Sequence, residues 1–161
     1  MAKLDGDPEL NPVNGDARPF SDWLTTFPML VGVIDPYTHE SSWLLDTVHR
    51  LFHHYRGAGV RVAWLVTADV EGVQSFLGPY AEEFLTFADP TAAAARALGL
   101  TTLPGAAVVR QDGEVLSLAN GWDPAAWREV SEEVGRLTNW TPLTLPGPKD
   151  PAPYAGTVVP N

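Results

Sequence analysis

The sequence predicts an α/β fold, a three-layer sandwich in which a mixed sheet lies between helices. Short β-branched runs such as Val60–Thr67 alternate with segments whose apolar residues recur at helical spacing. Later in the chain, Asp112–Gly113 separates two β-prone runs. This pattern is typical of a hairpin turn, so the last two strands are expected to be antiparallel. At 161 residues with 45% hydrophobic content, the chain is long enough for one domain with a substantial core.

The first third of the chain is expected to supply an arm, a short helix, a strand and a long helix. Residues 1–19 mix Pro, Gly, Asn and Asp with few apolar residues, which predicts an irregular N-terminal arm. Helical spacing in Phe20–Phe27 is followed by the apolar run Met29–Ile34, typical of a buried central strand. From residue 41 to residue 55 the apolar residues fall on one helical face, and the glycines that follow are expected to end this helix.

Strands and helices continue to alternate as far as residue 137. The expected elements after the strand at 60–67 are a helix at 68–77, a strand at 82–89, a helix at 90–100, the hairpin strands at 103–110 and 115–119, and a closing helix that Asp123 caps and Pro124 begins. The folded domain is therefore expected to span residues 20–137.

Residues 138–161 form a proline-rich tail that is expected to be extended. Prolines recur throughout this segment, so it can continue neither a helix nor a central strand. A polyproline-like conformation is the expected form. Trp140 and Tyr154 could anchor the tail to its own domain or offer it to a partner, and docking on its own domain is the favoured interpretation.

Composition excludes several classes of function. The formal charge is −10 and no basic cluster is present, so nucleic acid is not an expected partner. No apolar segment has the length of a signal peptide or of a membrane span, so we expect a cytoplasmic protein without membrane insertion. The chain has no cysteine, which excludes disulfides, thiolate catalysis and thiolate metal sites.

The order of elements resembles the thioredoxin fold over residues 20–137. A polar turn leads from the first central strand into a long helix, and Thr102–Leu103–Pro104 precedes the terminal hairpin. The spacing is similar to that of TlpA-like disulfide reductases, in which an aromatic residue and a Cys-x-x-Cys open a helix that ends in a leucine, an aromatic pair and Gly-Val. The segment LFHHYRGAGV, Leu51–Val60, supplies that end here.

This resemblance implies an active-site turn without its chemistry. Counting back from the end of the long helix places Tyr37 at the aromatic position and Thr38, His39, Glu40 and Ser41 over the Cys-x-x-Cys. Hydroxyl groups therefore stand where the family has both sulfur atoms. The resemblance thus implies that no thiol oxidoreductase or peroxidase activity runs through cysteine.

The resemblance also implies a partner-binding groove. Thioredoxins keep a buried carboxylate six residues before the first cysteine, and this position is Gly32 here. By contrast, Leu103–Pro104 is similar to the cis-proline loop, whose backbone forms hydrogen bonds with a bound peptide. The implied cis-proline groove is lined by Tyr37, Leu103, Pro104, Gly121 and Trp122, with His39 converging on it.

A narrower similarity links the chain to thioredoxin-like hydrogenase-maturation chaperones. These proteins also lack the cysteine pair, and they bind the signal peptide of a precursor. The matching residues are Asp22–Trp23–Leu24, Asp35–Pro36 and Asn120–Gly121 with Pro124. This similarity implies a role in assembly or maturation.

The favoured interpretation is a redox-inactive thioredoxin-like protein that binds a peptide or partner protein at the cis-proline groove, as an adaptor or chaperone without a cofactor. One alternative is a hydroxyl-dependent enzyme with Thr38 or Ser41 as nucleophile and His39 as base. Another is a structural subunit of a larger complex. The simpler interpretation of the hydroxyls is that Ser41 or Ser42 caps the long helix. Nothing in the sequence names the partner or the oligomeric state.

Two other features on the long helix are expected to be structural. His49 and His53 are four residues apart, but two imidazoles without a neighbouring carboxylate or thiolate make an incomplete metal site. We expect a solvated face there and no metal. Trp43 lies off the buried stripe and is expected to be covered by a terminal segment.

Overall fold

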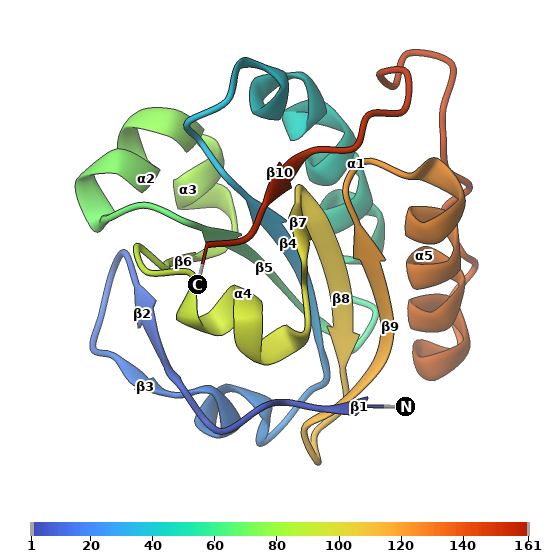
Figure 1. The fold of residues 1–161 in the computed structure, drawn as a ribbon. Helices are drawn as coiled ribbons and strands as arrows, with labels where there is room; N and C mark the ends of the chain where they lie inside the picture. The colour runs from blue at the N-terminus through green and yellow to red at the C-terminus, as the bar shows by residue number, and fades with distance from the viewer. Residues whose placement is uncertain (1, 161) are drawn as a thin grey trace.

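The computed structural model describes residues 2–160, apart from the side chain of His39. Its main sheet has eight strands in the order β1-β9-β8-β4-β5-β6-β2-β3, and helices cover both faces (Figure 1). A separate two-stranded sheet joins β10 to β7. The predicted three-layer α/β fold is confirmed.

Five strands form the centre of the main sheet. β4 (Met29–Ile34) lies between the parallel β5 (Arg61–Val66) and the antiparallel β8 (Gly105–Val109). β6 (Leu85–Ala88) extends the parallel side, and β9 (Glu114–Asn120) completes the expected hairpin with β8. Every residue of β4 is buried, as expected of a strand with helices on both faces. Its C-terminal end is therefore a rigid starting point for the polar turn that follows.

Two groups of helices cover the sheet. The helices that contribute to the core of one face are α1 (Leu45–Tyr55), α2 (Val70–Leu77), α3 (Tyr80–Glu83) and α5 (Pro124–Thr138). The 3₁₀ helix η1 (Phe20–Leu24) and α4 (Ala93–Leu98) contribute to the core of the other face. α5 begins as predicted, because the Asp123 carboxylate accepts a hydrogen bond from the Ala125 amide at 3.2 Å. Within the described residues, no helix is long and apolar enough to cross a membrane.

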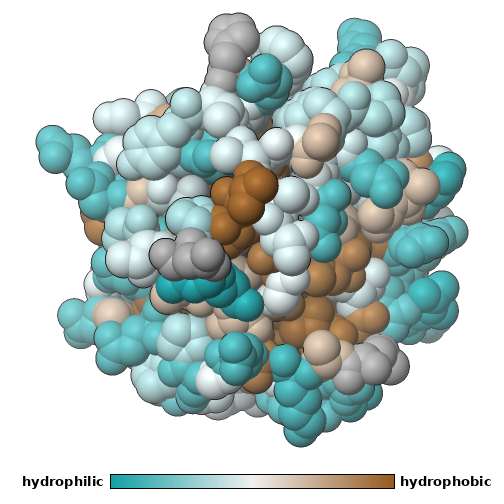
Figure 2. Space-filling model, viewed as in Figure 1, coloured by the Kyte–Doolittle hydropathy of each residue, from teal (hydrophilic) through white to brown (hydrophobic). Residues whose placement is uncertain are grey.

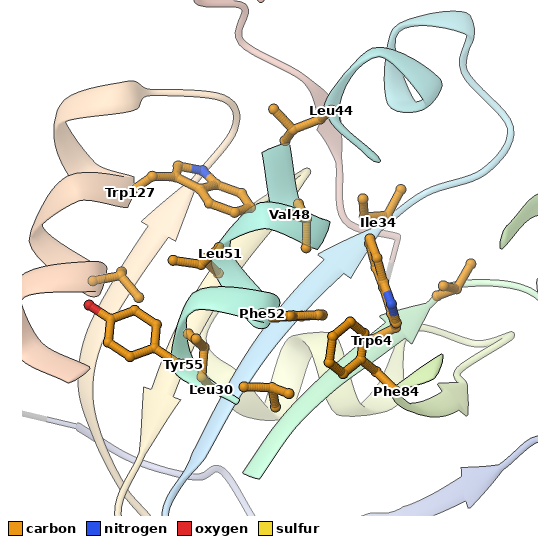
Figure 3. Packing of buried hydrophobic residues seen from close by; sticks show 14 of the residues in the cluster. Leu30, Ile34, Leu44, Val48, Leu51, Phe52, Tyr55, Trp64, Phe84 and Trp127 are labelled. Carbon is orange, nitrogen blue, oxygen red and sulfur yellow. The ribbon is translucent and has the colours of Figure 1, made fainter. Parts of the chain in front are cut away.

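The apolar face of α1 packs on the sheet as the sequence predicts. Val48 and Phe52 are fully buried, and the Phe52 ring meets Trp64 edge-on with the ring centroids 5.0 Å apart (Figure 3). The Tyr55 hydroxyl donates a hydrogen bond to the Ser131 carbonyl at 2.7 Å, which ties α1 to α5. These contacts position the start of α1, where the candidate site lies.

The N-terminal arm is ordered, which corrects the prediction of an irregular lead-in outside the domain. β1 (Ala2–Lys3) pairs with β9 at one edge of the sheet. β2 (Glu9–Pro12) pairs with β6 at the opposite side, and β3 (Arg18–Pro19) pairs with β2. Leu10 anchors the arm in the core with 2% of its surface exposed. Backbone pairing at sheet edges depends little on side-chain type, so the composition of the arm did not reveal it.

The C-terminal tail is docked on its own domain, as the favoured interpretation predicted. The Trp140 indole donates a hydrogen bond to the His54 carbonyl at 3.1 Å, just after α5 ends. The tail then runs back from the side of α5 toward the middle of the view in Figure 1, where β10 (Thr157–Val158) pairs with β7 (Thr102–Leu103). On the face shown in Figure 2, hydrophobic side chains gather near the middle, over the region that β10 and β7 occupy.

Candidate functional site

The first residue of the turn after β4, Asp35, stabilises the turn through its side chain. The Asp35 carboxylate accepts a hydrogen bond from the Tyr37 amide at 3.0 Å, which is the geometry of an Asx turn. The chain then enters the 3₁₀ helix η2 (His39–Leu44) before α1 begins. Tyr37 is 77% exposed, so most of its side chain faces solvent.

Thr38 and Ser41, which the resemblance aligns with the two sulfur positions, form a hydrogen-bonded pair. Their hydroxyl oxygens lie 2.6 Å apart, and the Ser41 amide donates to the Thr38 carbonyl at 3.3 Å. Ser41 is 2% exposed. Its hydroxyl is therefore engaged and shielded, which opposes its use as a nucleophile. The side chain of His39, the expected base, lies outside the described residues.

The capping interpretation of these hydroxyls is not supported for Ser41. The residue that precedes η2 is Thr38 and the residue that precedes α1 is Leu44, and neither caps its helix through a side chain. The reason is local: the chain enters a 3₁₀ turn at residue 39, so Ser41 lies inside this turn, where its hydroxyl reaches Thr38.

Apolar side chains fill the space where thioredoxins keep a buried carboxylate. Gly32 lies in the middle of β4, beneath α1. A Cβ atom at this position would lie 2.9 Å from Cγ1 of Val48 and 3.1 Å from Cζ of Phe52. A side chain there would require Val48 and Phe52 to shift. Apolar side chains, and no carboxylate, therefore lie against β4 at Gly32, in keeping with a turn that has no thiol to deprotonate.

Gly32→Ala is expected to destabilise the fold by about 1–3 kcal/mol, because the added methyl group overpacks the contact with α1. Urea unfolding gives the free-energy change. The double variant with Val48→Ala removes the opposing methyl groups, so its cost should be smaller than the sum of the two single costs. Additive costs would show that the contact with Val48 does not limit the space at Gly32.

The residue before Pro104, Leu103, has its side chain in the core and its backbone in β7. The Leu103–Pro104 peptide is cis. Leu103 is 2% exposed, and its side chain packs in the core on the α4 side of the sheet. Hydrogen bonding in an extended segment uses main-chain groups, so the Leu103 side chain is free to point into the core. The backbone of β7 is the part of this segment with which another strand can pair.

The tail occupies that backbone surface. Thr157 lies opposite Leu103 and Val158 opposite Thr102, in an antiparallel pair. The Val159 amide continues the pairing with a 2.9 Å hydrogen bond to the Thr101 carbonyl. Where thioredoxins receive a peptide, this chain holds a strand of its own.

A second contact binds the tail to the other wall of the implied groove. Tyr154 and Trp122 exchange two backbone hydrogen bonds, with N–O distances of 3.0 and 3.2 Å. Trp122 is 1% exposed, packs against Trp127 and donates its indole N–H to the Pro151 carbonyl at 2.8 Å. The implied groove residues other than Tyr37 thus come together, and the tail covers them.

Comparison with known proteins places this geometry in a family. A family model described as Redoxin matches residues 45–134, which is more than half of the chain. The chain belongs to the Redoxin family. The Redoxin match and the disulfide oxidoreductase neighbours confirm the resemblance to thioredoxin-like reductases. No curated protein sequence matches the chain. This Redoxin member has no cysteine, so it cannot carry out the cysteine-based redox chemistry usual in the family.

Solved structures share the fold of this redoxin at low sequence identity. A hypothetical protein from Sinorhizobium meliloti 1021 is 15% identical with a TM-score of 0.70, and the match covers 99% of this chain and 93% of that chain. A putative thiol:disulfide interchange protein DsbE from Chlorobium tepidum is 19% identical, with a TM-score of 0.66 and coverage of 86% and 98%. A secreted disulfide oxidoreductase from Mycobacterium tuberculosis is 20% identical, with a TM-score of 0.58 and coverage of 83% and 96%.

Asp150 fastens the tail of the redoxin to α1. Its side chain is 2% exposed, and its two oxygens accept hydrogen bonds from Arg50 at 2.9 and 2.7 Å. The Thr47 hydroxyl and the Gly147 amide donate to the same carboxylate at 2.7 and 2.6 Å. Burial alone opposes ionisation, but these donors outweigh it, so the pKa of Asp150 is lowered.

The pKa shift of Asp150 predicts a pH dependence of tail docking. A lowered pKa in the docked state means that docking is stabilised above the ordinary carboxyl range, about pH 4, and weakens as the pH falls through the docked-state pKa below it. The shift of the Val159 amide resonance with pH should report this step by NMR. Asp150→Asn cannot titrate and should remove the step, whereas an unchanged step would assign it to another group.

Tyr154 links the tail to the degenerate turn. Its hydroxyl donates to the Glu40 carbonyl at 3.0 Å, and its ring meets Trp43 edge-on at 6.3 Å. Burial, with the charge of Glu40, raises the pKa of Tyr154 to about 12. Trp43 remains 51% exposed, so its expected coverage by the tail is only partial. A pocket of about 260 Å³ lies between the turn and the tail and is lined by Thr38, Glu40, Tyr154, Ala155, Gly156 and Thr157.

The histidines on α1 form a side-chain cluster away from this site. His49 lies 2.8 Å from the Glu83 carboxylate, so the expectation that no carboxylate is nearby is wrong. The two residues are distant in sequence, and only the packing of α3 on α1 brings them together. The His49 ring also packs against Tyr80, with its side chain 27% exposed, and is therefore only partly solvated. No group of three metal-ligating side chains occurs in the described part of the chain.

The contacts that define the site come largely from residues that sequence reasoning missed. Asp150 and Gly156 lie in a segment whose prolines dominate its composition. A signal was present, because YAGTVV in the tail has β-branched residues after a glycine, as a short edge strand does. The binding partner of that strand was not visible, because it is a backbone surface on β7.

Proposed function

We propose that this redoxin binds an extended segment of a partner protein along β7 and acts as an adaptor or as a chaperone in assembly or maturation. The observation that carries the proposal is the tail itself. Residues 157–159 pair with residues 101–103, at the place where the resemblance puts the substrate of a thioredoxin. A site that holds one extended segment of this kind has the hydrogen-bonding groups to hold another.

The chemistry of the site favours holding a partner over reacting with it. Both hydroxyls at the former sulfur positions are hydrogen-bonded to each other, and apolar side chains fill the space beneath them. Strand addition needs no reactive group, since the affinity comes from main-chain hydrogen bonds and the specificity from the side-chain positions. The lack of thiols in the turn therefore does not prevent binding of an extended segment along β7.

Competition with the tail sequence tests this proposal. A partner retained from native extract on the immobilised chain should be released by a synthetic peptide of residues 151–160, because both occupy β7. A peptide of the same length and otherwise the same sequence, with its glycine replaced by alanine, is the matched control and should release little. Retention of the partner in excess tail peptide would contradict binding along β7.

A further inference from the structure

The backbone of the tail approaches the backbone of its own domain more closely than ordinary surface packing requires, and glycines at two positions permit this. A Cβ atom on Gly156 would overlap the carbonyl oxygen of Leu103, and a Cβ atom on Gly121 would overlap the carbonyl oxygen of Ala155. Gly156 also has φ +85°, in the left-handed region that favours glycine. Two backbones approach each other here at glycines on both sides. The strand position opposite Leu103 thus admits a ligand only if glycine precedes the paired residue.

The side chains around this glycine divide into engaged and free positions. Tyr154, two residues before it, lies between the Glu40 carbonyl and the Trp43 ring. Val159, three residues after it, is 7% exposed and joins the core on the α4 side. Val158, by contrast, is 75% exposed. The docked strand therefore gives the pattern that a ligand must match: an aromatic residue, any residue, glycine, a half-buried residue, an exposed residue and an apolar residue.

The tail is also held by contacts that a free peptide would not have. Asp150 is clamped to α1 by Arg50, and the Trp122 indole bonds to the Pro151 carbonyl. Only residues 151–153 separate the clamp from Tyr154, and two of them are prolines. Such a short tether gives the tail an effective concentration on the order of millimolar at β7, so an untethered ligand competes poorly.

We propose that residues 154–159 are a built-in ligand that closes the β7 surface, and that the partner carries the same pattern, aromatic-x-Gly-x-x-apolar, in an extended segment. This inference rests on the proposed function, because it assigns the ligand chemistry and the regulation of the same site. Release of the tail is then the step that makes the protein competent to bind, and the tail sequence is a guide to the partner.

Fluorescence anisotropy with a labelled peptide of residues 151–160 tests the proposal on full-length chains. Gly156→Ala displaces the tail, so this variant should bind the peptide at least about tenfold tighter than the unmodified chain. Gly113→Ala is the matched control, because Gly113 has φ +86° and open space around its Cβ position in the β8–β9 hairpin. Tyr154→Ala is a second opening variant, which removes the ring without a change in backbone strain.

Substitutions in the labelled peptide provide the second half of the test. Replacing its glycine with alanine should weaken binding to the open variants at least about tenfold, the loss expected when a close backbone contact is blocked by roughly 1.4 kcal/mol. Replacing the residue that corresponds to Val158 with serine should leave binding unchanged, because that position faces solvent. Indifference to the glycine, or equal binding to open and unmodified chains, would overturn the proposal.

The remaining outcomes are also decisive. No binding to either open variant would overturn the proposal, because β7 would then lack affinity for the tail sequence. If a partner were still captured in that case, the proposed function would stand, although the tail would not be a model of the partner's binding segment. Conversely, peptide binding together with partner retention that the peptide cannot compete would refute the proposed function alone. A dimer of the unmodified 17.4 kDa chain with exchanged tails would overturn the intramolecular contact.

Discussion

A variant with cysteine at both positions 38 and 41 is expected to form a disulfide that the natural chain cannot form. The Thr38 and Ser41 oxygens are already 2.6 Å apart, and the two residues are three apart in the chain. Cysteine is close in size to both residues, and an S–S bond of about 2.0 Å joins side chains with this spacing. A closed loop of this length should stabilise the oxidised fold by about 2 kcal/mol.

Thiol exchange by this double variant should depend on the tail. The pocket beside the turn is lined by Ala155 and Gly156, so the docked tail narrows access to residue 38. We expect weak insulin reduction by the double variant and at least about tenfold faster reduction when Gly156→Ala is added, because release removes an intramolecular competitor. The absence of an acid group beneath the turn should keep both rates below those of cysteine-containing relatives.

Mass spectrometry after thiol blocking measures the disulfide, and the insulin assay measures exchange. Each single cysteine variant is a control, since neither can form the intramolecular bond. Failure of the folded double variant to oxidise with diamide would contradict the alignment of Thr38 and Ser41 with the two sulfur positions. Equal insulin reduction with the tail docked and released would contradict the occlusion.

Arg50→Ala is expected to release the tail with the fold retained. This substitution leaves the Asp150 carboxylate buried with only the Thr47 hydroxyl and the Gly147 amide as donors. Only the Asp150 side of this ion pair is buried, and loss of its two hydrogen bonds from Arg50 costs about 1.5–3 kcal/mol. Arg50 lies on the surface of α1 and 38% of its side chain is exposed, so the core should not be disturbed.

Hydrogen exchange at the Val159 amide measures this release, because the amide is bonded to Thr101 only while the tail is docked. Arg128→Ala is the matched control on α5, where the side chain is exposed, and it should change exchange by less than about 0.5 kcal/mol. Unchanged protection of Val159 in Arg50→Ala would show that the pairing with β7 holds the tail without the clamp.

The sequence predicts the parts of this fold that follow from side-chain periodicity. The apolar run Met29–Ile34, the helical stripe of α1 and the turn at Asp112–Gly113 each specify an element whose register is set locally. The pairing of the arm with both sheet edges could not be predicted in this way, because edge pairing uses main-chain groups that every residue carries.

The candidate site was predictable in position and less so in its contacts. The spacing of the long helix indicated that Thr38 and Ser41 lie in the turn before it, yet it did not show that their hydroxyls bond to each other. The sequence did not indicate that the tail covers β7 and Trp122. Asp150 meets Arg50 across 100 positions of sequence, and no local pattern encodes such a contact.

The most direct test of the account is hydrogen exchange on the full-length chain with and without a captured partner. In the free chain the amide of Val159 should be protected, because it is bonded to the Thr101 carbonyl. With the partner bound, the account predicts that residues 154–159 lose protection while the amide of Leu103, which lies opposite Thr157 in the free chain, keeps it, since one strand has replaced another. Protection of the tail that is unchanged by the partner would contradict the account.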